Sequence, residues 1–166
     1  VSVDDLSTLI DGSSYEIGAR RMNANDWNII YTDSVRNLTL RNCTFENSVM
    51  AAIHAGGAGN QSSAYSDFPD KVLIDNCTFE NNGRNDIEII YGKNIQVTNC
   101  KGDNSLDIEM NGNELVESIS VSGCSFREFT PYSPSDISGT CEISVTNSTF
   151  NRVSAQVGAH AKLSNC

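Results

Sequence analysis

Apolar and polar residues alternate in short runs along this chain, and the runs recur at fixed positions around a cysteine. Residues 38–45, Leu-Thr-Leu-Arg-Asn-Cys-Thr-Phe, show the unit. If the Cys is position zero, apolar residues stand at minus five and minus three, a turn-former at minus one and an aromatic at plus two. Period-two alternation predicts a β-strand in each copy. The copies are centred on Cys43, Cys77, Cys100, Cys124, Ser148 and Cys166, and a weaker copy covers Ile10 to Tyr15.

The spacing of the copies predicts the architecture. Cys43, Cys77, Cys100 and Cys124 are separated by 34, 23 and 24 residues, a period typical of solenoids. The apolar positions hold mainly Ile, Val and Phe, which favours strands over the leucine-rich repeat pattern. We therefore expect an all-β fold, a right-handed parallel β-helix with three short strands per rung and about seven rungs. Asn at minus one, replaced once by Gly123, fits a left-handed corner, and stacked Asn amides can bond from rung to rung.

A second strand is expected after each Cys, in segments 27–31, 51–55, 87–91 and 106–110. Period-two alternation leaves the residues between the inward ones facing solvent. Pro131 and Pro134 argue against a regular ladder at 130–134, and segment 155–159 is expected to resume the strand. The residues expected to point inward are Trp27, Ile29, Ala51, Ile53, Ile87, Ile89, Leu106, Ile108 and Met110.

A long insertion, residues 55–71, is rich in Gly, Ser and Asp. Insertions in solenoids gather on one face, often the binding face. Tyr65 and Phe68 are therefore candidates for substrate binding, as a wall or platform for a sugar ring. The alternative is that both aromatic side chains fold back and anchor the loop.

The bulk composition limits the partners. A chain of 166 residues with 39% hydrophobic residues fits one domain, 1–166. Because it opens on Val1 and stops on a repeat Cys, we expect it to be part of a longer protein. A net charge of −10 speaks against a nucleic-acid partner, and no apolar run approaches the roughly 18 residues of a membrane span.

The four regularly spaced cysteines are expected to form a stack of small buried thiols. Stacked rungs would hold their Cβ atoms about 4.8 Å apart, beyond the usual separation in a disulfide. The place of Cys is taken by Ser148 in one copy, which agrees with a packing role. The chain has no Cys-x-x-Cys pair that would indicate a metal site.

The repeat unit reads [Ile/Val/Leu]-x-[Ile/Val/Leu]-x-Asn-Cys-[Thr/Ser]-Phe, and it is followed by Asn-Asn-Gly and a strand such as 86–92. With these units the chain resembles the right-handed parallel β-helix, pectate-lyase-like superfamily over about residues 8–166. This superfamily includes polysaccharide lyases, glycosidases, uronate epimerases and phage tailspikes. The resemblance implies that the strand bearing His54, Glu88, Asp107 and Glu109 forms the substrate face.

The resemblance does not identify a single enzymatic activity for this chain. Asp107-x-Glu109 resembles the paired acids that hold calcium in alginate and chondroitin lyases, which makes both residues candidate Ca²⁺ ligands. However, Glu114 stands roughly where the lysine base of those lyases would fall. The Arg-x-Pro-x-x-Arg of pectate lyases and the Asp-Pro-His-Asp of mannuronan epimerases are both missing from the sequence.

The expected register brings carboxylates together. It places Ala52, Glu88 and Asp107 in one outward row, and His54, Ile90 and Glu109 in the next. Neighbours about 4.8 Å apart suit the carboxyl separation of a retaining glycosidase, whereas Glu88 with Glu109 on a diagonal could reach that of an inverting one. Like charges this close raise one pKa and so provide a general acid. The alternatives are a Ca²⁺ site and a solvated acidic face.

Three basic side chains accompany the carboxylates. His54 is a candidate general acid or base, with an inert surface histidine as the alternative. Lys93 and Arg84 flank the acidic strand and are candidates for binding substrate carboxylates, with a merely solubilising role as the alternative.

These features favour a polysaccharide-recognising and polysaccharide-cleaving protein, a lyase or glycosidase, in which Glu88, Asp107, Glu109 and His54 are the catalytic candidates. Three of five Asn-x-Ser/Thr sequons fall in the tight turn of the repeat, which favours a secreted bacterial or phage tailspike protein over a glycosylated eukaryotic one. The alternative is a non-catalytic spacer or adhesin module. Exposed strand edges at both ends predict neighbouring segments or trimer partners.

Overall fold

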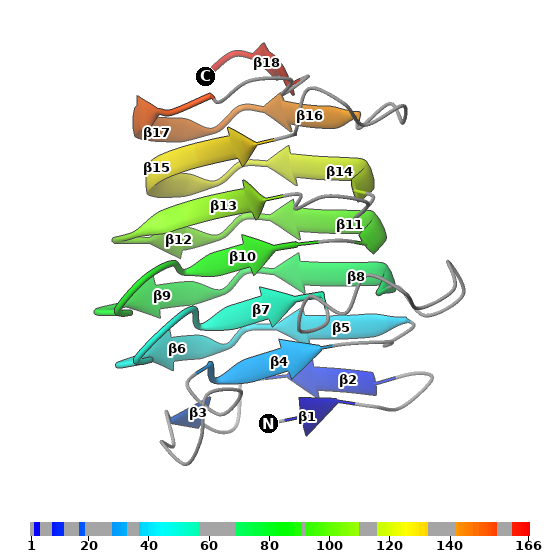
Figure 1. Ribbon diagram of the computed structural model, residues 1–166, viewed down its shortest axis with the longest axis vertical. Coiled ribbons are helices and arrows are strands. Elements are labelled where there is room, and N and C mark those ends of the chain that lie inside the picture. The colour runs from blue at the N-terminus through cyan, green and yellow to red at the C-terminus, as the bar shows by residue number, and fades with distance from the viewer. Residues whose placement is uncertain are drawn as a thin grey trace.

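The computed structural model describes residues 28–32, 37–56, 69–90, 92–109, 116–132, 142–155 and 161–166, together with the backbone of three short strands before residue 19. These residues form a coil of strands stacked along one axis (Figure 1). Every strand pair among them is parallel, as predicted. The described part of the chain has no helix of the length and apolar character needed to cross a membrane.

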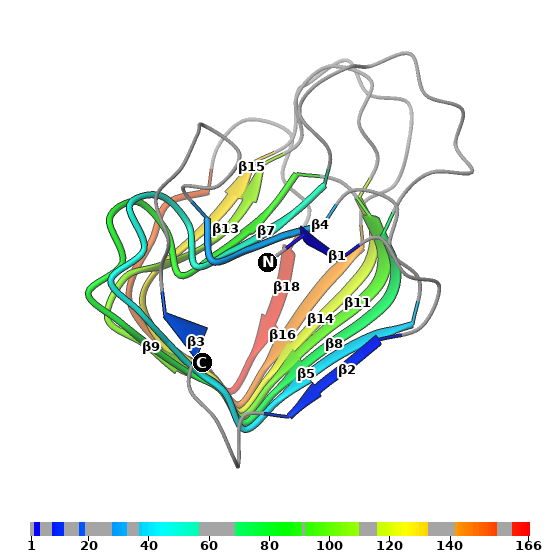
Figure 2. The ribbon, with the colours of Figure 1, turned by 90° about the horizontal axis from the view of Figure 1, so that it is seen from below.

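Three faces surround the axis of the coil (Figure 2). The repeat sheet contains the strand that precedes each Cys. Its strands are β2 (Thr8–Asp11), β5 (Leu38–Arg41), β8 (Asp70–Asp75), β11 (Gly92–Thr98), β14 (Val116–Ser122), β16 (Ile143–Thr146) and β18 (Ala161–Ser164).

The other two faces belong to one folded sheet that β15 (Ser125–Tyr132) joins by running through both. The aromatic face contains β3 (Ile17–Gly18), β6 (Thr44–Glu46), β9 (Thr78–Glu80), β12 (Lys101–Gly102), the start of β15 and β17 (Thr149–Val153). The third face contains β1 (Ser2–Val3), β4 (Ile30–Thr32), β7 (Ile53–Ala55), β10 (Ile87–Ile89), β13 (Ser105–Glu109) and the end of β15.

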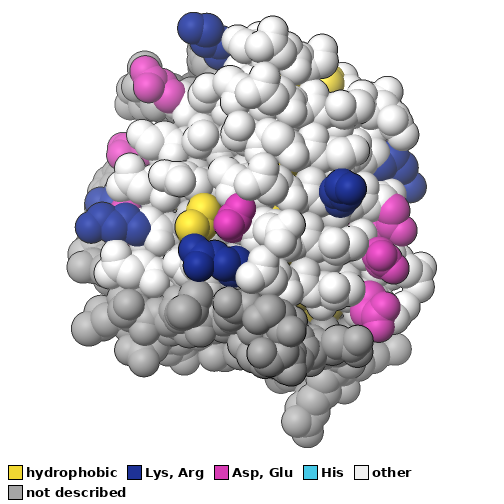
Figure 3. All heavy atoms as spheres, turned by 180° about the vertical axis from the view of Figure 1, so that it is seen from behind, with side chains coloured by type: hydrophobic (Ala, Val, Ile, Leu, Met, Phe, Trp, Pro, Cys, Tyr) yellow, Lys and Arg dark blue, Asp and Glu magenta, His cyan; other side chains and the backbone are white. Residues whose placement is uncertain are grey.

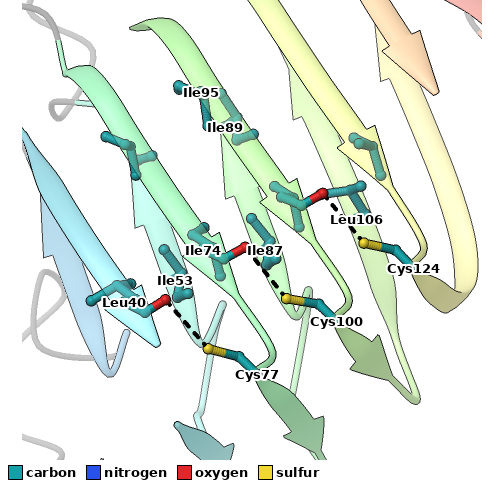
Figure 4. Packing of buried hydrophobic residues seen from close by; sticks show 14 of the residues in the cluster. Leu40, Ile53, Ile74, Cys77, Ile87, Ile89, Ile95, Cys100, Leu106 and Cys124 are labelled. Carbon is teal, nitrogen blue, oxygen red and sulfur yellow. Dashed lines mark hydrogen bonds between the residues drawn. The ribbon is translucent and has the colours of Figure 1, made fainter. Parts of the chain in front are cut away.

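The apolar positions of the repeat form columns inside the coil (Figure 4). At minus three, Leu40, Ile74, Val97, Val121 and Val145 follow one another in register and are completely buried. This continuous column explains why equivalent residues in every copy are apolar, since each packs against the copies above and below.

Aromatic rings form a second column, at plus two. Phe45 stacks on Phe79 with ring centroids 5.2 Å apart, and Phe79 meets Phe126 at 6.1 Å. Gly102 takes the intervening place, where an added Cβ would lie 2.5 Å from the ring of Phe126 and 2.0 Å from a carboxylate oxygen of Asp86. Glycine is thus required where the aromatic column passes a buried acid.

The cysteines form the predicted thiol stack. Cys43, Cys77, Cys100 and Cys124 are buried and unbridged. Each sulfur of the last three donates to a carbonyl of the preceding rung, at 3.4 to 3.7 Å (Figure 4). The buried Ser148 occupies the same place and donates to the Thr146 carbonyl at 2.8 Å. The stack therefore satisfies carbonyls at the corner as well as filling space.

The corners of the coil are left-handed, as predicted for position minus one. Every residue there has a positive φ: 54° at Asn42, 51° at Asn76, 55° at Asn99, 66° at Gly123, 50° at Asn147 and 53° at Asn165. The side chain of Asn76 donates to that of Asn42 at 2.7 Å. A second Asn pair, Asn81 to Asn47, repeats this bond at another corner, also at 2.7 Å. Asn thus supplies both the tolerated conformation and a bond between rungs.

A buried polar network lies at the corner between β9 and β10. Asp86 has no exposed surface; it accepts hydrogen bonds from the Asn82 amide at 2.9 Å and the Asn104 backbone N–H at 2.8 Å. Asn82 also accepts from the Ser48 backbone in the preceding rung, at 3.1 Å. Burial raises the pKa of Asp86 to about 6, against the opposing effect of these donors.

Two expectations about strands were wrong. Ile30 is inward and pairs with Ile53, so the alternation in β4 is shifted by one residue from the predicted phase. Ile29 is also buried, but it precedes the strand; Trp27 and Met110 lie outside the described residues.

The second wrong expectation concerns Pro131, which pairs with Ile108 in a regular ladder. Proline has no backbone N–H to donate, but the pairing of β15 with β17 ends at Phe129, so no described strand on the other side of Pro131 requires a donor. Most of segment 155–159 is outside the described residues.

The outer surface seen from behind is largely uncharged (Figure 3). Basic side chains on it are scattered, whereas acidic side chains lie one above another along the right edge of this view. On the repeat sheet, Arg41 of β5 pairs with Asp75 of β8 at 3.7 Å.

The left-handed corner can be tested at position 76. We expect Asn76→Ala to lower the free energy of unfolding by about 1–2 kcal/mol more than Asn76→Gly, because both lose the amide bond to Asn42 but only Ala strains the backbone. Urea denaturation of both variants measures the difference. Equal losses would contradict the role of the backbone conformation.

The pH dependence of stability can be tested at Asp86. Its raised pKa means that the native state holds the proton more tightly than the unfolded state, so its contribution falls as pH rises from about 4 through 6. Between pH 5 and pH 8 we expect the contribution of Asp86 to fall by about 1 kcal/mol, so Asp86→Asn should lose about that much less stability over this range than the unaltered protein. Denaturation at both pH values measures it, with Glu46→Gln, an exposed carboxylate on β6, as control. An unchanged slope in Asp86→Asn would contradict it.

Candidate functional site

One row of polar side chains runs along the third face, parallel to the axis of the coil. Strand register places His54 beside Glu88 and Glu88 beside Asp107, with Tyr31 and Thr130 at the two ends. These residues come from β4, β7, β10, β13 and β15, which lie one above another in Figure 1. His54, and not Ala52 as predicted, is thus the neighbour of Glu88.

Glu88 is the centre of the row. Its side chain is 2% exposed, and both of its oxygens are engaged. Oε2 lies 2.6 Å from Nδ1 of His54, and Oε1 accepts from Arg84 at 2.9 Å and from the Asn85 amide at 3.3 Å. Burial acts to raise the pKa of Glu88, but the bond to His54 and the charges of His54 and Arg84 outweigh it and lower the pKa below its usual value. Glu88 is therefore an ionised carboxylate.

Asp107 has the opposite character. It is only partly buried, and it accepts one hydrogen bond, at 3.2 Å, from the same Asn85 amide that serves Glu88. Burial together with the charges of Glu109 and Glu88 raises the pKa of Asp107 to about 7, although Arg84 and Asn85 oppose the shift. Two carboxyl groups in adjacent rungs thus differ in protonation near neutral pH.

Glu109 completes a group of three carboxylates. Its side chain is 28% exposed and accepts from Arg84 at 3.1 Å. One oxygen each from Glu88, Asp107 and Glu109 lies within 4.8 Å of the others. This is closer than the separation of the two carboxyls in an inverting glycosidase.

The arrangement suits Arg84 better than a metal ion. Three carboxylates form a donor set that Ca²⁺ accepts. However, the Arg84 guanidinium already contacts Glu88 and Glu109, and both oxygens of Glu88 are used. A cation would have to displace Arg84, so the residues as they stand do not fit a calcium ion.

His54 is held from two sides. Its ring stacks on Tyr31 from the preceding rung, with centroids 5.1 Å apart and planes 6° from parallel. Glu88 in the following rung fixes its Nδ1. The side chain keeps 15% of its surface exposed, so the imidazole is oriented yet reachable.

The remaining predicted site residues do not all gather here. Arg84 does, but it pairs with protein carboxylates, and Lys93 lies on β11 of the repeat sheet between Asp70 and Glu117. Tyr65 and Phe68 fall outside the described residues.

Sequence reasoning missed Asn85 and Tyr31. Asn85 bridges Glu88 and Asp107 and accepts from Ser105 Oγ at 2.6 Å, which fixes its amide orientation. The register of His54 was detectable, because His54 and Glu88 each stand eleven residues after their repeat Cys. Tyr31 was missed because its strand was assigned the wrong phase.

Comparison with known proteins bears on the fold alone. No curated protein and no solved structure matches the chain. A family described as the right-handed β-helix region matches residues 27–166, which includes every side chain of the polar row. This match and the parallel coil agree, and the chain belongs to the right-handed β-helix family.

Proposed function

We propose that this protein binds a glycan along the third face and hydrolyses a glycosidic bond, with Asp107 as the general acid. The observation that carries the proposal is a partly exposed carboxyl whose pKa is raised to about 7, beside a carboxylate that remains ionised. A glycosidic oxygen needs a proton to leave, and an acid with a pKa near the working pH delivers it most effectively.

The charge of the row bears on the substrate class. Glu88, Asp107 and Glu109 face only Arg84 and His54 as basic partners in the described part of the site. An acidic centre repels uronates, so neutral or amino-bearing glycans suit it better than pectin or alginate. A lyase would also need a basic group free to neutralise the uronate, and Arg84 is occupied while Lys93 lies on another face. Hydrolysis is therefore favoured over β-elimination.

A polymeric glycan substrate would place the protein outside the cell, as a secreted bacterial enzyme or a phage tailspike. The second candidate is a non-catalytic binding module. It is favoured by the burial of Glu88 and by the ion pairs that tie three rungs together, since such a network stabilises a fold whether or not it performs chemistry.

Turnover and binding separate the two candidates. With a panel of neutral, amino-bearing and uronate glycans, we expect reducing-end release from a neutral or amino-bearing member. Asp107→Asn should lower kcat by about 100-fold or more with binding retained, because the acid is lost while its shape remains. Glu117→Gln, an exposed change on β14, is the matched control. Binding without turnover in the unaltered protein would leave the binding module.

Removal of Arg84 tests whether it stands in for a cation. We expect CaCl₂ to raise the Tm of Arg84→Ala but not of the unaltered protein, because the variant leaves three carboxylate oxygens within 4.8 Å of one another. Each kcal/mol of binding should raise the Tm by about 3 °C. The double variant Arg84→Ala/Asp107→Asn is the control and should lose the effect. An equal calcium effect without any substitution would show that Arg84 does not compete.

A further inference from the structure

The imidazole of His54 has one nitrogen in use and one available. Nδ1 lies 2.6 Å from Glu88 Oε2, and an ionised carboxylate can only accept. Nδ1 therefore carries a proton, and whenever the ring is uncharged Nε2 keeps its lone pair. Among the described residues, Nε2 makes no hydrogen bond, and the side chain reaches the surface. A histidine oriented in this way by a carboxylate is suited to act as a base.

Glu88 itself is poorly placed to react. Only 2% of its side chain is exposed, and its two oxygens accept from His54, Arg84 and Asn85. A nucleophile or base must approach the sugar or a water molecule directly. The imidazole and the carboxyl on either side of it, those of His54 and Asp107, are both partly exposed.

The spacing along the row favours one stereochemical course. His54 and Asp107 lie two rungs apart, and two steps of about 4.8 Å separate their backbones by roughly 10 Å. The side chains of base and acid are about 6.5–9.5 Å apart in inverting glycosidases and about 5–5.5 Å apart in retaining ones, so a two-rung spacing is nearer to the inverting arrangement. Glu109 and Asp107 are too close for that arrangement, since their nearest oxygens lie within 4.8 Å.

We propose that His54 Nε2 is the general base that activates the attacking water in an inverting hydrolysis, and that Glu88 is a positioning residue for His54. This inference rests on the glycan-cleaving function proposed above. Tyr31 supports the same geometry by stacking on the ring from the rung before.

The step balances without any further reactant. The water oxygen forms a bond to the anomeric carbon, and its proton passes to His54 Nε2. The bond between the anomeric carbon and the glycosidic oxygen breaks, and that oxygen takes the proton of Asp107. His54 then ends protonated and Asp107 ionised, and proton exchange with solvent restores both.

The anomer formed first by the unaltered protein is the direct test, followed by proton NMR during hydrolysis. We expect inversion. His54→Ala should lower kcat by about 100-fold or more with KM nearly unchanged, and azide should restore turnover by replacing water and forming a glycosyl azide of inverted configuration. Glu88→Gln should lower kcat about tenfold or more at similar KM, because the amide no longer fixes the tautomer of His54.

Each outcome decides between the two proposals. Retention of configuration, or normal kcat in folded His54→Ala, would overturn the role of His54 while glycan hydrolysis by Asp107 stood. A fall in binding in place of kcat in Glu88→Gln would show a structural role for Glu88 and overturn its positioning role. If the unaltered protein cleaves no glycan, the proposed function itself fails.

Discussion

The left-handed corners of the coil fix the register of its strands, and every other feature depends on that register. A strand that slips by one residue exchanges its inner and outer faces. Here the chain turns at Asn42, Asn76 and Asn99 with nearly equal φ values, and neighbouring thiols bond to carbonyls of the preceding rung. Errors therefore cannot accumulate from one rung to the next, and side chains far apart in the sequence stand in line on the outside.

The polar row results from this alignment, and its negative charge lowers the stability of the folded chain. Carboxylates stacked at the strand spacing repel each other, and Glu88 in addition gives up its water. The chain offsets this with Arg84, which bonds to Glu88 and Glu109, and with Asn85, which donates to Glu88 and Asp107. The compensation is uneven. Glu88 receives most of the donors and stays ionised, whereas Asp107 is left with a pKa near 7.

The sequence was sufficient for the fold because the repeat is a local signal repeated many times. The Cys column, the Asn corners and the parallel pairing all follow from one eight-residue pattern. The candidate site was only partly predictable. Glu88 and Asp107 were correctly placed side by side, but the burial of Glu88 depends on His54 and Arg84 packing against it. That is a property of three rungs together, which no single copy of the repeat contains.

The position of the site along the coil is explained by the corner between the aromatic face and the third face. This corner holds six residues, 47–52, before β7 and six, 81–86, before β10, but only two, 103–104, before β13, and β15 passes it without a break.

The last long corner supplies Arg84 and Asn85 to the carboxylates outside and Asp86 to the network inside. The short corner that follows brings Asp107 into line only seven residues after its Cys. A regular solenoid would repeat the same side chains in every rung. The change in corner length allows one place on the coil to differ from the rest, and the unusual carboxylates lie where a six-residue corner is followed by a two-residue corner.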